Sequence, residues 1–334
     1  MPIAGETEPR MITRRLAARG IGIGLLLMPL AAEAQPVGSA PTVGVLLPHR
    51  LDRDFDAFLA KLGELGYEDG RNVRLVISSA DTKLDRLPGL AAELVRRNPS
   101  VIVTINTPPT RAAIDATREI PIIMGLVGDP VGSGFVRNLS RPEGNVTGLS
   151  NIAPDLSAKR LQILKEIIPD AGRIAVLFNP DDPVTTPQRQ ETERAAVQVG
   201  VTVRFFPVRT QEGLTAAFDE VARWRADAVQ WLGGQEHAFV PSSIKIAADR
   251  RFPLMVPRRQ QVEAGALMSY VPDAPAQYRA VAVYADKILK GAKPGDLPVE
   301  QPTKIALSIN VSSARALGLA LPPSIVARAD EVFE

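Results

Sequence analysis

A repeated order of short apolar runs and longer amphipathic segments extends through most of this 334-residue chain and limits how it can fold. Runs rich in β-branched residues begin at positions 43, 73, 101 and 121, and a second set begins at positions 174, 201, 228 and 253. Corresponding runs are therefore 131, 128, 127 and 132 positions apart. Strands that alternate with helices are typical of parallel sheets covered on both faces. The pattern predicts an α/β fold with two Rossmann-like lobes of the same plan, each built on a parallel sheet.

The boundaries of these segments follow from apolar periodicity and from glycine and proline stops. In the first set we expect strands at 43–47, 73–77, 101–105 and 120–124, and helices at 55–65, 87–95 and 111–117. In the second set we expect strands at 174–178, 201–206, 228–232 and 253–256, and helices at 155–168, 187–199, 212–224 and 242–250.

The remaining segments fit crossings between the lobes. Residues 144–148 leave the first lobe, a strand at 265–270 returns the chain, a helix follows at 278–289, and the tail holds a strand at 303–310 and a helix at 311–317. We assign residues 40–148 with about 290–334 to lobe one, and 149–289, including the hinge crossovers, to lobe two. Several crossings form a multi-crossover hinge, which restricts the lobes to opening and closing.

The first 34 residues have the pattern of a secretory signal peptide. Four arginines between positions 10 and 19 precede an apolar run at 21–31, and Ala32-Glu33-Ala34 ends the segment. The run is about half of the roughly 20 residues that span a bilayer, and its two glycines and one proline disfavour a buried helix. We expect cleavage before Gln35, export to the periplasm and no membrane anchor. The Arg14-Arg15 pair resembles a twin-arginine signal, and the general secretory route remains equally open.

Composition excludes several classes of protein. The chain has no cysteine, hence no disulfide, thiolate nucleophile or lipid-modified cysteine, and its two histidines, His49 and His237, are far apart. Removing residues 1–34 takes away four arginines and three glutamates, so a net charge of +2 becomes +1, which disfavours nucleic acid as a partner. No nucleophile elbow, phosphate-binding glycine loop or zinc-protease motif is present. We therefore expect no catalytic residues, no metal and no cofactor.

Ligands of parallel α/β sheets bind beyond the carboxyl ends of the strands. The loops at those ends are rich in small polar groups, which suits a small polar ligand held without a reaction. We expect Asp129 to receive a ligand ammonium, Arg258 to pair with a carboxylate, and Tyr270 to form a flat wall. The other candidates supply neutral hydrogen bonds: Asn106, Thr107, Asn179 and Gln235.

Each candidate also has a purely structural interpretation. Asp129 precedes Pro130 and is a good turn former, and Asn179 also fits a turn that leads into a helix. Thr107 or Thr110 is expected to cap the helix that follows. The two tryptophans, Trp224 and Trp231, are expected in the core, because they fall on helix and strand positions.

Several segments also resemble a known family when they are taken together. They are 66–73 (GYEDGRNV), 85–88 (DRLP), 90–95 (LAAELV), 128–131 (GDPV), 139–148 (LSRPEGNVTG), 159–161 (KRL), 265–270 (GALMSY), 301–304 (QPTK), 316–319 (ALGL) and 329–332 (ADEV). In order and spacing they resemble the ABC transporter substrate-binding proteins that include tryptophan/tyrosine-type uptake receptors. The resemblance implies a type I periplasmic binding fold with two lobes, three crossovers, a ligand in the cleft and delivery to an ABC permease in the inner membrane.

We therefore expect a monomeric periplasmic receptor of an ABC importer, not an enzyme, that captures a small polar ligand such as an amino acid or a related compound. The first alternative is an exported α/β enzyme, such as a hydrolase, that uses the same cleft. Such an enzyme would need a nucleophile and a base, which the sequence does not clearly offer. The sensory lobe of a transcription regulator is the second, and it is disfavoured because no DNA-binding domain precedes Thr42.

Overall fold

The computed structural model describes residues 40–51, 53–152, 155–182, 184–233 and 239–334, and residues 39–334 form one compact unit. The expected signal peptide at 1–34 lies outside the described residues, and so do Gln235 and His237. Among the residues described, no helix has both the length and the apolar character needed to cross a membrane.

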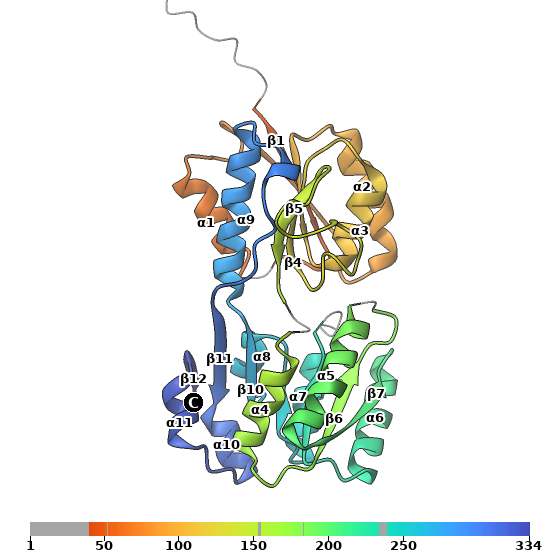
Figure 1. Cartoon of the computed structure of the whole chain (residues 1–334), viewed down its shortest axis with the longest axis vertical. Coiled ribbons are helices and arrows are strands. Elements are labelled where there is room, and N and C mark those ends of the chain that lie inside the picture. Colours follow the sequence, from red (N-terminus) through yellow and green to blue (C-terminus); the bar gives the residue numbers. More distant parts are fainter. Residues whose placement is uncertain (1–39, 52, 153–154, 183, 234–238) are drawn as a thin grey trace, which may run out of the picture. The chain divides into compact units, whose positions relative to one another are not determined.

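The first sheet has five parallel strands in the order β2-β1-β3-β4-β5. Its strands are β1 (Thr42–Leu47), β2 (Arg74–Ser79), β3 (Val101–Ile105), β4 (Ile122–Val127) and β5 (Val146–Ser150). One face is covered by α1 (Asp56–Glu64) and α9 (Ala274–Leu289), and the other by α2 (Leu87–Arg96) and α3 (Thr107–Ala116) (Figure 1). Two short 3₁₀ helices, η1 (Leu84–Arg86) and η3 (Pro294–Asp296), complete this half.

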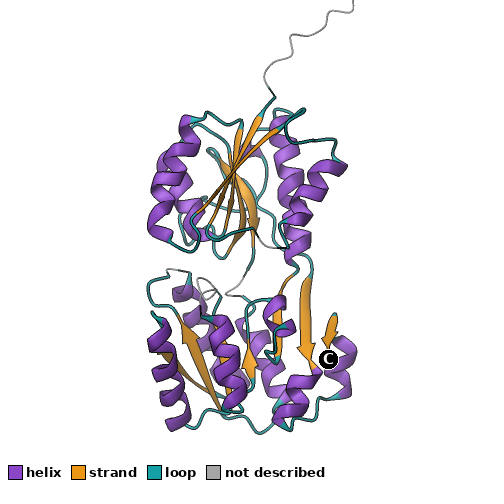
Figure 2. Cartoon of the chain, turned by 180° about the vertical axis from the view of Figure 1, so that it is seen from behind, coloured by secondary structure: helices purple, strands orange, loops and turns teal. Residues whose placement is uncertain are grey.

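The second sheet has seven strands in the order β12-β11-β10-β9-β8-β6-β7. They are β6 (Arg173–Phe178), β7 (Thr202–Pro207), β8 (Ala228–Trp231), β9 (Leu254–Met255), β10 (Met268–Pro272), β11 (Ile305–Asn310) and β12 (Glu331–Phe333). One face is covered by α4 (Ser157–Ile167), α5 (Thr185–Val199), α10 (Val311–Leu317) and α11 (Pro323–Arg328). The other is covered by α6 (Gln211–Arg223), α7 (Val240–Asp249) and α8 (Arg259–Glu263). Figure 2 shows the strands of each sheet between their helices.

The two halves share one topology. The order β7-β6-β8-β9-β10 in the second sheet repeats the order β2-β1-β3-β4-β5 of the first. This repetition explains the constant spacing of strand segments along the sequence and confirms the predicted α/β fold with two lobes. The chain passes between the halves three times: after β5, between β10 and α9, and between Glu300 and β11.

The C-terminal segments do not divide between the two halves at the boundaries that we expected. We expected 290–334 in lobe one and the preceding helix in lobe two, but β11 pairs with β10 and β12 pairs with β11 in the second sheet. In the first half, α9 packs its buried residues Tyr278, Val281 and Tyr284 against β1, β3 and α1. The apolar face of α9 fits the uncovered face of the first sheet, and β11 completes the edge of the second sheet as an antiparallel partner.

Strand β5 falls where the sequence suggested only a connection. The register of β4 against β5 shifts between Met124 and Val127, and Leu126 has φ 58°. Gly148 has φ 134°, and a Cβ there would lie 2.0 Å from the Met124 carbonyl oxygen. Glycine at 148 therefore allows β5 to lie against β4 and to direct the chain into the first crossing.

Candidate functional site

A cleft of about 830 Å³ is lined by residues from both halves of the chain. About half of its lining comes from loops that follow strands. The order of strands reverses between β1 and β3 and again between β6 and β8. Open parallel sheets bind ligands at such switch points. A cavity of this size accommodates a small organic molecule.

On the first half, the loops after β1 and β3 form one wall of the cleft. Asn106 occupies φ 69° and ψ 170°, a strained backbone conformation that is otherwise almost confined to glycine. Its amide N–H donates to the Gly125 carbonyl oxygen at 2.8 Å. The Thr110 hydroxyl donates to the Asn106 carbonyl oxygen at 2.8 Å and also bonds the Thr104 hydroxyl at 2.7 Å. These bonds hold the start of α3, and with it Asn106 and Thr107, against the cleft.

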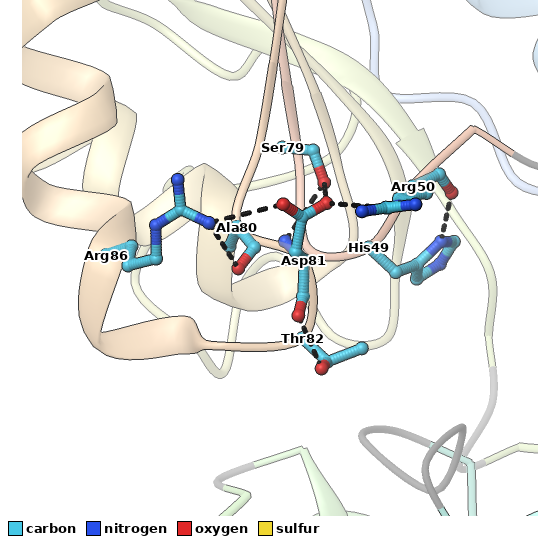
Figure 3. A network of polar contacts seen from close by, with 7 residues as sticks. All are labelled: His49, Arg50, Ser79, Ala80, Asp81, Thr82 and Arg86. Atoms are coloured by element: carbon cyan, nitrogen blue, oxygen red, sulfur yellow. Dashed lines mark hydrogen bonds and ion pairs between the residues drawn. The ribbon is translucent and has the colours of Figure 1, made fainter.

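A polar network at the ends of β1 and β2 supports the same wall (Figure 3). The Asp81 carboxylate accepts hydrogen bonds from the Ser79 hydroxyl at 3.0 Å and from Arg50 and Arg86, each at 3.3 Å. The Ser79 hydrogen bond and the two arginines hold the pKa of Asp81 below its ordinary value. His49, which lines the cleft, hydrogen-bonds the Arg50 carbonyl oxygen through Nδ1 at 2.8 Å.

On the second half, the loop after β6 is fixed by its own side chains. The Thr185 hydroxyl bonds the carbonyl oxygens of Asn179 at 3.1 Å and Asp182 at 2.8 Å. The Asn179 side-chain oxygen accepts from the Asp181 amide at 3.0 Å, as in a turn. Asp182 is buried, with 1% of its surface exposed, and its carboxylate accepts from the Val184 amide at 3.1 Å.

The loop after β8 is held by an amide clamp from α5. The Gln188 Nε2 donates to the Gly233 carbonyl oxygen at 2.8 Å, and Gln188 Oε1 accepts from the Gly233 amide at 3.1 Å. Gln188 also donates to the Val184 carbonyl oxygen at 3.2 Å, and its side chain is buried. One side chain therefore ties the loops after β6 and β8 together at the cleft.

Four arginines border the cleft on the second half: Arg160, Arg209, Arg258 and Arg259. Arg160 is buried, and its Nε donates to the Tyr270 carbonyl oxygen at 3.0 Å. Burial lowers the pKa of Arg160 to about 10, partly opposed by Tyr270, so the guanidinium stays charged at neutral pH. Arg259 is paired with Glu331 at 2.6 Å, which raises its pKa, and Arg258 precedes it at the start of α8.

Two polar contacts near the cleft involve the crossings. Gln260 on α8 donates to the buried Asp54 carboxylate, which precedes α1, at 2.6 Å, so this bond joins the two halves. Lys304, in the third crossing, binds Asp273, in the second, at 2.9 Å. Partial burial alone would raise the pKa of Asp273, but the hydrogen bonds from Lys304 and the Ala276 amide bring it below its ordinary value.

The structure brings four of the seven expected ligand residues to this cleft: Asn106, Thr107, Asn179 and Arg258. Asp129 lines a separate hollow of about 310 Å³, and its carboxylate accepts from the Gly132 amide at 2.8 Å, the contact of a turn residue. Tyr270 packs against the core of the second half, while the next residues, Val271 and Pro272, line the cleft.

The tryptophans lie where packing places them. Trp231 is buried and donates from Nε1 to the Ser243 hydroxyl at 3.0 Å. Trp224 packs against Phe206 with the ring centroids 6.0 Å apart and the ring planes tilted by 56°.

Several cleft residues lay beyond the reach of the strand-end rule. Gln188, Arg160 and Gln277 come from helices. Only the KRL segment at 159–161 carried any sequence signal, through the family resemblance. Among the residues that the structure describes, no group of three or more metal-binding side chains comes together.

Comparison with known proteins gives a family and several similar structures. A family model described as ABC transporter substrate binding protein matches residues 43–333. A tyrosine-binding protein from Clostridioides difficile is 27% identical over 274 residues, which cover 80% of this chain and 77% of that protein.

Two solved structures extend this similarity to the fold. An ABC domain in complex with L-Trp, from Streptococcus pneumonia, is 26% identical with a TM-score of 0.82, covering 88% of this chain and 100% of that one. The ligand-free, open structure of a substrate binding protein with adhesive properties, from Clostridium difficile, is 25% identical with a TM-score of 0.67, covering 88% and 99%. A third structure, a 5-methylthioribose transporter solute binding protein from Thermotoga lettingae, shows similarity of fold alone. It is 13% identical with a TM-score of 0.57, covering 86% of this chain and 97% of that one.

Proposed function

On the premise that this chain belongs to the family of ABC transporter substrate binding proteins, we propose that its cleft captures an amino acid or a closely related small polar compound. Members of the family are solute-binding receptors that take up small molecules and work with a membrane permease, and this chain is such a receptor. The family and the relatives named above are substrate-binding proteins rather than enzymes.

The main observation in favour of an amino-acid-like ligand is that positive and negative side chains border the same cleft. Arg160 and Arg258 border it, and so do the buried carboxylates Asp54 and Asp182. An amino acid carries a carboxylate and an ammonium that suit these two kinds of partner. We assign the carboxylate to Arg258 and the ammonium to Asp182, with Asn106, Thr107 and Asn179 supplying neutral hydrogen bonds.

The relatives' ligands support an amino acid, but the lining favours a polar one. One relative is a tyrosine-binding protein and another was solved with L-Trp. Among the described lining residues of this cleft, His49 and Phe239 are the ones that carry an aromatic ring. A cleft with so little aromatic surface offers few stacking partners for an aromatic ligand. We therefore expect polar amino acids to bind more tightly than tyrosine or tryptophan.

The wider setting follows from the sequence pattern at the N-terminus. We propose that the chain is exported, that cleavage before Gln35 yields a free monomer, and that this monomer delivers its ligand to an ABC permease in the inner membrane. Recovery of the protein from the periplasm with Gln35 at its N-terminus supports this setting, whereas recovery with Met1 intact contradicts it.

A ligand screen tests the function directly. The full chain is mixed with each of the common amino acids and with a set of polar solutes, and thermal stabilisation identifies binders for calorimetry. At least one polar amino acid or close relative is expected to bind with micromolar affinity, and scattering should show a smaller radius of gyration with that ligand. Absence of any stabilisation, together with no small molecule released from the purified protein in mass spectrometry, would refute the proposal.

Two charge variants test the assignment of the cleft. Arg258→Ala and Asp182→Asn each remove one charged partner from a site shielded from water, which is expected to cost about 2–5 kcal/mol of binding, or at least about thirtyfold in affinity. Arg96→Ala, on the exposed surface of α2, is the matched control and should bind as the wild type does. If Arg258→Ala also binds like wild type, the ligand carboxylate does not use Arg258.

A further inference from the structure

Gln277 is a polar side chain in the cleft wall whose hydrogen-bonding capacity the described structure does not use. It lies on the first full turn of α9, lines the cleft, and has 3% of its surface exposed. Neither Oε1 nor Nε2 has a hydrogen-bond partner within the described part of the chain. Buried amides are nearly always paired in folded proteins, so an unused one beside a ligand cleft requires a reason.

The helix places Gln277 at the ligand-binding edge of the first sheet. A Cβ at Gly125 would lie 3.0 Å from Val281 Cγ2, so Val281 packs directly on β4. Gln277 is four residues earlier and therefore on the same face of α9, one turn nearer to the cleft. At that level β4 ends at Leu126 and Val127, where the backbone of Leu126 takes a positive φ.

The surroundings of Gln277 favour a neutral group over an anion. The N-terminus of α9 would ordinarily attract a negative charge. Here the Asp273 carboxylate already caps it by accepting from the Ala276 amide at 3.1 Å, and Lys304 balances that carboxylate. Pro275 has no N–H to offer, and the Gln277 amide N–H donates to the Asp273 carbonyl oxygen. The amides of Ala276 and Gln277 are therefore occupied, and the side-chain amide of Gln277 is available to a ligand.

We propose that Gln277 forms a subsite that takes a neutral ligand group carrying a hydrogen-bond acceptor and donor side by side, such as a carboxamide or a ureido group. A primary amide presents one acceptor and two donors, and another amide-like group matches it through a pair of hydrogen bonds. The inference rests on the proposed function, because it adds a side-chain specificity to the amino-acid-like ligand. It predicts that amide-bearing ligands are preferred to their acids.

Fragments that contain only the recognised group test the subsite without knowledge of the ligand. The full chain is labelled with ¹⁵N, and the side-chain NH₂ signals of Gln277 are identified by their loss in Gln277→Met. Acetamide, which has a donor and an acceptor, is expected to shift these signals in a saturable manner up to about 100 mM. Acetate, which is anionic and has acceptors only, is expected to leave them in place.

The control is Gln198→Met, which makes the same substitution at an exposed position on α5 and should keep the acetamide response. Gln277→Met should be at least as thermally stable as wild type without ligand, because it removes an unpaired buried amide. It should also reduce a preference for L-glutamine over L-glutamate, or for L-asparagine over L-aspartate, from tenfold or more to under about threefold.

The outcomes separate this subsite from the receptor function. If acetamide leaves the Gln277 signals unchanged, or if acetate moves them equally, the subsite is overturned even where amino acids bind. If acetamide binds at Gln277 but no amino acid stabilises the protein, the subsite stands and the proposed ligand class fails. A marked loss of stability in ligand-free Gln277→Met would show that the amide serves the fold, and would also overturn the subsite.

Discussion

The amide clamp of Gln188 makes the sharpest prediction about what shapes the cleft. Replacing it by methionine, a side chain of similar length, removes three hydrogen bonds: two to Gly233 at 2.8 and 3.1 Å, and one to the Val184 carbonyl oxygen at 3.2 Å. The change leaves the Gly233 amide and carbonyl without this partner beside the cleft. Gly233 is only partly buried, so water can replace some of the lost bonds.

The magnitude follows from these contacts. Each neutral hydrogen bond contributes about 0.5–1.5 kcal/mol net, which gives about 3 kcal/mol for three. Hydration of Gly233 and the apolar burial of methionine offset part of this, leaving an expected loss of about 2 kcal/mol in the free energy of unfolding. For a compact unit of about 300 residues, with an unfolding entropy of about 2.1 cal/mol/K per residue, that corresponds to a decrease of roughly 3 °C in Tm. Because Gly233 lines the cleft, ligand affinity should also fall.

Thermal and urea unfolding of the ligand-free protein measure the loss of stability. Calorimetry with the ligand that the screen identifies measures the loss of affinity. Gln198→Met places the same substitution on the exposed side of the same helix and should change stability by less than about 0.5 kcal/mol. Gln188→Glu keeps the acceptor but cannot donate to the Gly233 carbonyl oxygen, so it should lose stability as well. If Gln188→Met unfolds at the same temperature as Gln198→Met, the clamp contributes nothing and the reasoning is refuted.

Three further predictions concern the framework around the cleft. Gly148→Ala should lower the free energy of unfolding, measured in urea, by about 3 kcal/mol or more. The control Gly134→Ala, at φ 69° with no atom within 4 Å of the new Cβ, should lower it by only about 1 kcal/mol. Equal losses in the two variants would contradict the steric argument. Burial, and then its hydrogen bond to a carboxylate on α9, raises the pKa of Tyr67 to about 12. Because the folded state keeps this proton while the unfolded state loses it near pH 10, stability should decline from pH 10 to 12, and Tyr67→Phe should make that decline shallower in unfolding curves. Gln260→Leu removes the bond to Asp54 between the halves, so ligand-free protein should show a larger radius of gyration by scattering; an unchanged radius would mean that this contact does not hold the halves.

The sequence predicted the repeated part of the fold well, because local periodicity determines it. The helix expected at 87–95 is Leu87–Arg96, and the strand expected at 174–178 is Arg173–Phe178. The tail was assigned to lobe one, whereas β11 and β12 pair in the second sheet, because the partner of β11 depends on which sheet edge is free. Strand β5 was also missed, because it depends on Gly148 fitting against Met124, a contact between distant residues.

The site was predictable only where it follows strand ends. Asn106 and Asn179 come directly after β3 and β6, and both line the cleft. Asp129 follows β4 in the same way, yet its side chain turns back to the Gly132 amide, as a local hydrogen bond can compete with a ligand. Gln188 and Gln277 lie within helices, where only the packing of the helix on its sheet decides which side chains reach the cleft.

Each half contains elements that come late in the sequence, and this has a consequence for biosynthesis. The first sheet begins at Thr42, but one of its faces is covered by α1 alone until α9, which ends at Leu289, has been made. The second sheet likewise lacks its edge until β12 at Glu331–Phe333. The first half is therefore complete only after most of the second has been synthesised, and the second half is complete only at the end of the chain. The nascent chain therefore keeps apolar surface exposed until its last tens of residues, which is the state that chaperones bind.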